Sequence, residues 1–547
     1  MRNVQVEAAQ RLDIAEPLHQ PRRVDHLGHE SPLLLGHQPT YTSRVKTLYR
    51  ARRVYTLSHP QTGDWLLVDE RHVERVGVGE SPAADRLVEL PGTVILPGFI
   101  DTHVHLTGTG LSRLGIPIER ARSAEELLGL VAEELTHDPA KVLAHGFDES
   151  HWERPELPSG PDLDDLGDVP IILVRADGHL SLANAPALKE SGAIELEGVE
   201  RDEVGRPTGV VRREANERVQ RWFHEALTDH EIRELQLQAA ALAASRGVTC
   251  VHEMAIPAWR GRRDVEVLME HRAQLPVDVV PYVADKDIPY VMDLGLETIG
   301  GDLSLDGSIG ARTAALSEPY RDDRGRGALY EREDGLAEFF HNAHLAGFQV
   351  AVHAIGDAAI EQAVGAWERV YRALDSRGRR HFRARRHRIE HFELCTADQV
   401  ERAAALGLAI SIQPAFDAAW GHPGALYDRR LGSERAAAMN PFGALLARGL
   451  LLGAGSDSPI TELDPMEGLW ALETHHDPSQ RMNREEAVRL FTAGSAALAH
   501  LEDKKGRLRP GMQADFAAYD ADPVSADDPR GIRPVLTVSR GREVFAT

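Results

Sequence analysis

The sequence predicts an α/β protein, a (β/α)8 barrel of the TIM type joined to a small β-sandwich domain formed by both ends of the chain. Short apolar runs alternate with helical patterns eight times through the middle of the chain, which is typical of this barrel. Strand-like segments such as "WLLVDERHVERVGVG" and "PVLTVSRGREVFAT" lie near the two ends. About 140 residues separate the first barrel strand from the second, more than one crossover needs, so a large insertion follows the first strand.

The predicted barrel strands are separated by helices with start and stop signals. The eight strands are Ile95–His105, Val248–Glu253, Val277–Val283, Asp302–Asp306, Gln349–His353, Arg388–His391, Leu408–Gln413 and Leu451–Asp457. Thr228 and Glu231 have the spacing of a capping box, and Thr396 with Gln399 opens another helix in the same way. Spacing alone leaves a doubly wound sheet open as the alternative.

The chain divides into four predicted parts. These are a tail over residues 1–41, the β-sandwich domain over 42–94 and 503–547, the barrel over 95–502, and within it an insertion at about 107–227. We expect the insertion to act as a lid or side wall at the barrel mouth.

Composition argues against several classes of binding partner and several cellular locations. The net charge of −23 argues against nucleic acid and anionic membranes as partners. The two cysteines, Cys250 and Cys395, form no disulfide framework, which fits a reducing compartment. No apolar run has the length of a membrane span, and the first residues lack a secretory signal, so a cytoplasmic protein is expected.

The stretch "LPGFIDTHVH" ends in two histidines, His103 and His105, one residue apart. On a β-strand, residues two apart point to the same face, so both imidazoles could bind one metal ion. Two ordinary hydrogen-bonded histidines are the alternative for this motif alone.

Further polar residues collect where other predicted strands end, and in a barrel these ends converge on one face. They are Asp302 and Asp306, His353, His391 and Asp457. Imidazole nitrogens and carboxylate oxygens suit zinc or a similar divalent ion. Taken singly, His353 could be a core histidine and Asp457 a helix cap, but together the residues predict a metal site.

The motifs "PGFIDTHVH", "HAIGD", "RIEH" and "GSDSPI" resemble those of the metal-dependent amidohydrolase superfamily. More narrowly, "GFDESHW", "DGSIGARTAALSEPY" and "DPMEGLWAL" resemble the YtcJ-like branch, which includes N-substituted formamide deformylase. The resemblance covers most of residues 45–547. It implies hydrolysis of a C–N bond in an amide or related group, with one or two divalent metal ions, zinc being the expected one.

The resemblance assigns roles to residues, with one departure. The implied ligands are His103, His105, Asp302, His353, His391 and Asp457. Many members of the superfamily carry a lysine, which can be carboxylated, where this chain has Asp302. Asp302 could supply the carboxylate itself or be a solvated residue at a strand start, with Glu253 as a reserve carboxylate. Asp457 is the expected proton acceptor. His391 is expected either to bind a metal ion or to polarise the carbonyl group of the substrate.

Four residues are candidates for substrate binding: His179, Trp152, Arg312 and Gln413. Each has a structural alternative, such as lid packing for Trp152 or pairing with an internal acid for Arg312. The expected partner is a small molecule, and a homodimer is one option for the oligomeric state.

Three other functions compete with this interpretation. A deaminase or cyclic amidine or imide hydrolase would use a similar site. The chain could also be a catalytically silent metal-binding homologue, in which Asp302 is a sign that the centre has lost its activity. A redox or nucleotide-binding enzyme is disfavoured, because no G-x-G-x-x-G follows a predicted strand and the chain has no P-loop motif.

Overall fold

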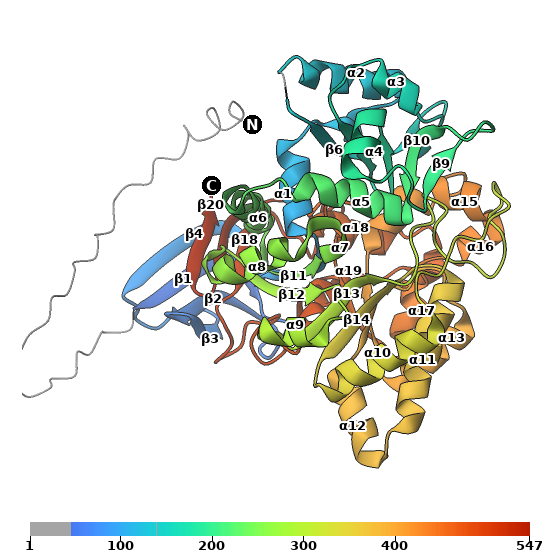
Figure 1. Ribbon diagram of the computed structural model, residues 1–547. Coiled ribbons are helices and arrows are strands. Elements are labelled where there is room, and N and C mark those ends of the chain that lie inside the picture. Colours follow the sequence, from blue (N-terminus) through green and yellow to red (C-terminus); the bar gives the residue numbers. More distant parts are fainter. Residues whose placement is uncertain (1–44, 138) are drawn as a thin grey trace, which may run out of the picture.

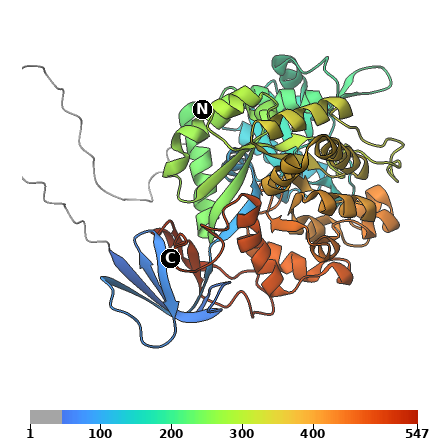
Figure 2. The ribbon, with the colours of Figure 1, turned by 90° about the horizontal axis from the view of Figure 1, so that it is seen from below.

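The computed structural model describes residues 45–137 and 139–547, so the predicted tail over residues 1–41 lies outside the described residues (Figure 1). Strands from the two ends of the described chain form one sheet in the order β20-β19-β18-β4-β1-β2-β3. Figure 2 shows these strands, blue and dark red, side by side at one end of the molecule. Their bounds are β1 (Lys46–Tyr55), β2 (Thr62–Asp69), β3 (His72–Gly77), β4 (Arg86–Pro97), β18 (Phe516–Tyr519), β19 (Pro534–Ser539) and β20 (Arg542–Ala546).

This terminal sheet is one mixed, bulged sheet, whereas the sequence predicted a β-sandwich. β1 runs parallel to β4, and the other neighbouring strands are antiparallel. Register irregularities interrupt β1 against both neighbours, and bulges of this kind bend a sheet. Apolar residues from strands far apart in the order, such as Val73 and Val538, therefore share one buried core.

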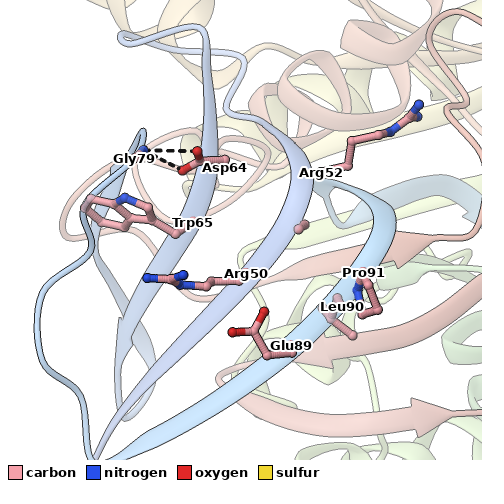
Figure 3. Close-up of a pocket in the computed structure, with 9 residues that line it drawn as sticks. Arg50, Arg52, Asp64, Trp65, Gly79, Glu89, Leu90 and Pro91 are labelled. Atoms are coloured by element: carbon pink, nitrogen blue, oxygen red, sulfur yellow. Dashed lines mark hydrogen bonds between the residues drawn. The ribbon is translucent and has the colours of Figure 1, made fainter.

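A hollow of about 290 Å³ lies on the terminal sheet between β1, β2 and β4 (Figure 3). Arg50, Trp65 and Glu89 line it, and the Asp64 carboxylate accepts from the Gly79 backbone N–H at 3.0 Å. None of the predicted site residues lines this hollow.

Eight parallel strands form the centre of the described chain, and each overlaps a predicted barrel strand. They are β5 (Phe99–Val104), β11 (Val248–Ala255), β12 (Asp278–Val283), β13 (Thr298–Ser304), β14 (Gln349–Ala354), β15 (Arg388–His391), β16 (Ala409–Ile412) and β17 (Leu451–Ala454). Their order in space follows their order in the chain, without the reversal of a doubly wound sheet. The first predicted barrel strand, Ile95–His105, needs correction. Residues 95–97 belong to β4 of the terminal sheet, and β5 begins after Gly98.

The eight strands are hydrogen-bonded as two sheets, and the barrel is not continuously closed. β12, β11 and β5 form one sheet, and β13 to β17 form the other. The sheets meet at two places. Val104 forms an isolated parallel bridge with Ser458, and Thr298 Oγ1 donates to the Pro281 carbonyl oxygen at 2.5 Å. The carboxyl ends of all eight strands still collect on one side, where barrel enzymes place their sites.

Helices cover the parallel strands, as the sequence predicted. The longer ones are α6 (Asp229–Ser245), α8 (Arg262–His271), α10 (Glu333–Leu345), α11 (Asp357–Ala373), α12 (Ser376–Arg385), α13 (Ala397–Leu406) and α18 (Pro465–Thr474). Shorter ones are α7 (Pro257–Arg260), α9 (Ile288–Asp293), α14 (Pro414–Trp420), α15 (Leu426–Leu431), α16 (Ser433–Ala437), α17 (Phe442–Ala447), α19 (Arg484–Arg489) and α20 (Ser495–Leu498). The capping boxes of α6 and α13 are both present. Within the described ranges, no helix is both long and apolar enough to span a membrane.

The segment between β5 and α6 builds a further layer with its own sheet (Figure 1, upper part). The strand order is β6-β7-β8-β10-β9. The strands are β6 (Val142–Phe147), β7 (Ile171–Arg175), β8 (Leu180–Ala183), β9 (Val199–Arg201) and β10 (Pro207–Arg212). The helices are α1 (Leu106–Leu114), α2 (Ala124–Leu135), α3 (Gly160–Asp164), α4 (Ala185–Ser191) and α5 (Arg213–His224). Two apolar clusters pack against this sheet, so the insertion has a core of its own.

Candidate metal centre

Three buried histidines at the strand ends share one hydrogen-bonding pattern, in which Nδ1 of each ring is engaged. The bonds run from His103 to Glu390 Oε2 (3.1 Å), from His105 to the Met254 carbonyl oxygen (2.8 Å), and from His391 to Gln413 Oε1 (2.8 Å). A hydrogen bond donated from Nδ1 fixes the tautomer of a ring and leaves Nε2 available for a metal ion.

Two buried carboxylates face these Nε2 atoms. His103 Nε2 lies 3.3 Å from Asp302 Oδ1 and 3.4 Å from Asp457 Oδ1. His105 Nε2 lies 3.2 Å from Asp302 Oδ2 and 3.1 Å from Asp457 Oδ1. His391 Nε2 is farther away, at 3.8 Å from Asp302 Oδ1. The fold thus brings five of the six predicted ligands into mutual contact.

A glycine pair positions Asp302. Gly300 and Gly301 precede it with φ of 90° and 79°, in the region that only glycine adopts readily. The register of β13 against β14 shifts between Gly300 and Ser304. A Cβ on Gly300 would lie 2.0 Å from the carbonyl oxygen of Ala351, so the close approach requires glycine. This bulge directs the short aspartate side chain toward the histidines, and Asp302 is buried rather than solvated.

His391 and Asp457 also have unusual backbone conformations. Their φ angles are 70° and 58°, in the left-handed region that non-glycine residues rarely adopt. Such conformations cost about 1–3 kcal/mol each and cluster where the surrounding structure fixes a functional side chain. The Asp457 backbone N–H donates to the His103 carbonyl oxygen at 2.8 Å, which ties the two ends of the site together.

The electrostatics of the site favour a bound cation. Burial alone would lower the pKa of His103, but the carboxylates of Asp302 and Asp457 raise it well above its usual value. The same balance raises the pKa of His105 to about 9. Burial alone would raise the pKa of Asp302, but His103 and the neighbouring imidazoles lower it well below its usual value. Two ionised carboxylates thus attract positive charge in a buried space.

Two overlapping groups of side chains could each hold a metal ion: His103 with His105 and Asp457, and His103 with Asp302 and His391. His103 Nε2, Asp302 Oδ1 and Asp457 Oδ1 are buried and form no hydrogen bond with the part of the chain that the structure describes. Tetrahedral zinc, with bonds of about 2.0–2.2 Å, separates its ligand atoms by about 3.4 Å, close to the distances found here. The residues present therefore fit one or two divalent ions.

The sixth predicted ligand, His353, lies beside these groups without joining either. Its ring centroid is 4.6 Å from that of His391, and its Nδ1 lies 3.4 Å from Asp306 Oδ1. Asp306 accepts backbone N–H groups of Ala315, Ile355 and Gly356, so it also organises the surrounding loops.

The insertion contributes His179 to the wall of the same small cavity. His179 lies 5.4 Å from His353 and 5.6 Å from Trp259, measured between ring centroids. Burial lowers its pKa to about 4, so the ring is neutral. The preceding Gly178 has φ of 72°, and a Cβ there would approach the Trp259 ring to 3.2 Å. The "DGH" turn therefore lets the insertion reach the metal centre.

The other predicted substrate ligands lie outside this cavity. Trp152 is buried in the insertion core and donates to the Ala121 carbonyl oxygen at 2.9 Å. Arg312 forms two hydrogen bonds to the Asp322 carboxylate, the shorter at 2.8 Å. Gln413 holds His391, as described above. Substrate contact by these three stays a prediction.

Sequence reasoning missed the residues behind the ligands. Glu390 accepts from both His103 and Arg388, and the three side chains are fully buried. Its place next to His391 in "RIEH" was the only signal in the sequence. The reserve carboxylate Glu253 instead accepts from the Leu106 backbone N–H at 2.6 Å, and burial raises its pKa to about 7.

Comparison with known proteins agrees with this geometry. The sequence matches the amidohydrolase family over residues 86–545. The chain belongs to the amidohydrolase family. It is 29% identical over 498 residues to YtcJ of Bacillus subtilis (strain 168), whose name assigns it to the amidohydrolases, covering 84% of this chain and 89% of that protein. N-substituted formamide deformylase of Arthrobacter pascens is more distant, at 23% over 480 residues, 80% of this chain and 85% of that protein.

A solved structure also resembles this amidohydrolase. An uncharacterized metal-dependent hydrolase from Pyrococcus horikoshii superposes with a TM-score of 0.70 at 25% sequence identity. The match covers 89% of this chain and 99% of that one. The predicted family membership and its YtcJ-like character are confirmed.

Proposed function

We propose that this amidohydrolase hydrolyses a C–N bond of a small molecule, in an amide, formamide or N-acyl group, with water activated by one or two divalent metal ions. The observation that carries the proposal is the buried set of His103, His105, Asp302, His391 and Asp457, in which His103 Nε2, Asp302 Oδ1 and Asp457 Oδ1 form no hydrogen bond with any described residue. The name of the formamide deformylase and the metal dependence of the Pyrococcus hydrolase support the bond class and the metal. Zinc is the expected ion.

A divalent ion bound here supplies a Lewis acid, which lowers the pKa of a water molecule and polarises a carbonyl group. The chain supplies the rest. Asp457 lines the cavity and takes the proton of the attacking water, then returns it to the leaving nitrogen. His353, which belongs to neither ligand group, lines the same wall and donates to the carbonyl oxygen of the substrate.

Metal analysis combined with a substrate panel tests this proposal. Purified protein that has met no chelator should contain at least one divalent ion per chain and should hydrolyse members of a panel of formamides and N-acyl amines. Asp457→Asn, assayed with excess divalent metal so that the site stays loaded, should lose about 10²-fold or more in kcat. Asp293→Asn is the matched control, because Asp293 is an exposed aspartate outside the site. Full activity of Asp457→Asn would refute the assignment of the proton acceptor.

The released products separate the competing activities. A deacylase or deformylase releases a carboxylic acid and an amine, whereas a deaminase acting on an amidine-type substrate releases ammonia. Ammonia release without acid release would replace the proposed bond class by the deaminase alternative. Protein without bound metal and without hydrolysis of any panel member would favour a catalytically silent homologue.

A further inference from the structure

The cavity at the metal centre is too small for a whole substrate. It measures about 30 Å³ and is lined by His105, Asp302, His353, His391 and Asp457, among others. This is close to the volume of one water molecule in the liquid. A reacting group fits there, so the remainder of a substrate has to occupy an adjoining cavity.

One larger cavity shares two residues with the metal centre. It measures about 400 Å³, within the range of small-molecule sites, and Asp302 and Trp259 line both cavities. Its other walls come from the ends of β11, β12 and β13 and from α5 of the insertion, which contributes Glu214 and Glu217. The cavity thus lies on the catalytic side, between the parallel strands and the insertion.

This adjoining cavity carries an excess of negative charge. Four glutamates and one arginine line it. Two of the glutamates are already neutralised, since Glu197 pairs with Arg213 at 2.5 Å and Glu331 with Lys286 at 2.6 Å. Glu214 and Glu217 form no ion pair with any residue that the structure describes. Burial and the nearby Glu214 raise the pKa of Glu217, whereas Arg221 on the same helix lowers it, so Glu217 has one like and one opposite charge beside it.

A second large cavity is a weaker candidate for binding the remainder of the substrate. It measures about 710 Å³ but shares only the apolar Ile460 with the metal centre. Its charges are balanced in part, because Arg246 pairs with Asp464 at 3.1 Å and Arg120 with Glu119 at 3.5 Å.

We infer that the acid-lined cavity binds a positively charged group of the substrate, so that this amidohydrolase acts on C–N bonds of small molecules that carry an ammonium group. Two observations beyond the glutamates support this. Asp302, which faces His103 and His105 in the smaller cavity, also lines the larger one, so a substrate whose reacting group lies at the metal centre can extend to the glutamates. Trp259, at the same junction, offers an indole ring, and cations bind favourably against such rings. The inference rests on the proposed function, since it names the substrate class of the same site.

The test compares three formamides of equal alkyl chain length, which end in an ammonium, a methyl group or a carboxylate, with the metal-loaded full chain. We expect kcat/KM to be highest for the ammonium compound and lowest for the carboxylate. Glu217→Gln should lower the ratio of kcat/KM between the ammonium and methyl compounds about tenfold, mainly through KM, because one favourable charge is lost. Glu338→Gln, on the exposed side of α10, should leave this ratio unchanged.

The outcomes separate this inference from the proposed function. Equal kcat/KM for the three compounds, or preference for the carboxylate, would overturn the inference. Hydrolysis of these compounds would still support the proposed function. If no formamide is hydrolysed, calorimetry with an alkyl diamine as the probe decides. Binding that weakens in Glu217→Gln but not in Glu338→Gln would uphold the cationic site, and absent or equal binding would overturn it.

Discussion

His103 donates from Nδ1 to Oε2 of Glu390 across 3.1 Å, and Arg388 donates to the same carboxylate oxygen at 2.8 Å. Glu390 thereby orients the imidazole that belongs to both candidate ligand groups. Carboxylates behind a ligating histidine fix its ring and raise its basicity.

Replacing Glu390 should therefore weaken metal binding without removing any ligand. Glu390→Gln is expected to lower the affinity for zinc about 10- to 100-fold, measured by competition with a chelator of known affinity. Glu338→Gln is the matched control for a change from glutamate to glutamine. Unchanged affinity in Glu390→Gln would show that the Arg388 pair, rather than the metal site, requires this carboxylate.

Asp302 should be a metal ligand in place of the lysine found in many relatives of the superfamily. Asp302→Asn keeps the shape of the side chain but removes the charge that faces His103 and His105. We expect this variant to bind less metal per chain than the parent, by elemental analysis of protein purified without chelator. Identical metal content in both proteins would make Asp302 a bystander and favour a single ion held by His103, His105 and Asp457.

The bulge before Asp302 should not tolerate a side chain. Gly300→Ala adds a Cβ that would lie 2.0 Å from the Ala351 carbonyl oxygen, at a φ of 90°. Gly295→Ala is the matched control, since Gly295 also has a positive φ, 70°, but no atom within 4 Å of the added Cβ. We expect the control to cost about 1–2 kcal/mol in stability and Gly300→Ala about 1–3 kcal/mol more, with reduced metal content. Equal melting temperatures of the two variants would contradict this view of the bulge.

His387 should make the metal-free protein less stable in mild acid. Val350 donates its backbone N–H to His387 Nδ1 at 3.1 Å, and burial lowers the pKa of His387 well below 6.5. Below pH 6.5 the unfolded chain therefore binds a proton that the folded chain excludes. Stability should fall with decreasing pH by about 1.4 kcal/mol per pH unit for this group.

Thermal unfolding of the metal-free protein between pH 6.5 and about pH 5 measures this effect. His387→Gln should be less stable at neutral pH but should show a shallower dependence on pH than the parent. The buried His224 and His252, whose pKa values burial also lowers, leave part of the slope in place. An equal slope in parent and variant would mean that other groups account for the acid sensitivity.

The sequence is sufficient to predict the strands and the polar side chains that gather at their ends, because both are local signals. A buried parallel strand is a short apolar run, and a histidine or aspartate at its end is visible in the motif itself, as in "PGFIDTHVH" and "GSDSPI". The sequence leaves open whether Asp302 faces the histidines or the solvent, since its direction depends on the register shift of β13 against β14 next to Gly300.

Contacts between distant segments of the chain are what the sequence alone does not predict. Glu390 meets His103 across 287 positions of the chain, and no pattern near either residue encodes that contact. Residue type alone makes Arg312 and Trp152 candidate substrate ligands, whereas their contacts with Asp322 and Ala121 depend on how distant loops fold together. The terminal sheet was predicted from strand patterns at both ends, which do not distinguish two stacked sheets from one bent sheet.

The pairing of β4 with β18 has a consequence for how the protein is made. Pro97 pairs with Phe516, immediately before the chain enters β5 and its histidines. During translation, His103 and His105 leave the ribosome long before β18 and Asp457 have been synthesised. Contacts at such sequence separation form slowly, so the nascent chain exposes two imidazoles while their carboxylate partner at Asp457 does not yet exist. Metal captured at that stage would be held by an incomplete centre, and the segment after β17 has to be synthesised before Asp457 can complete the site.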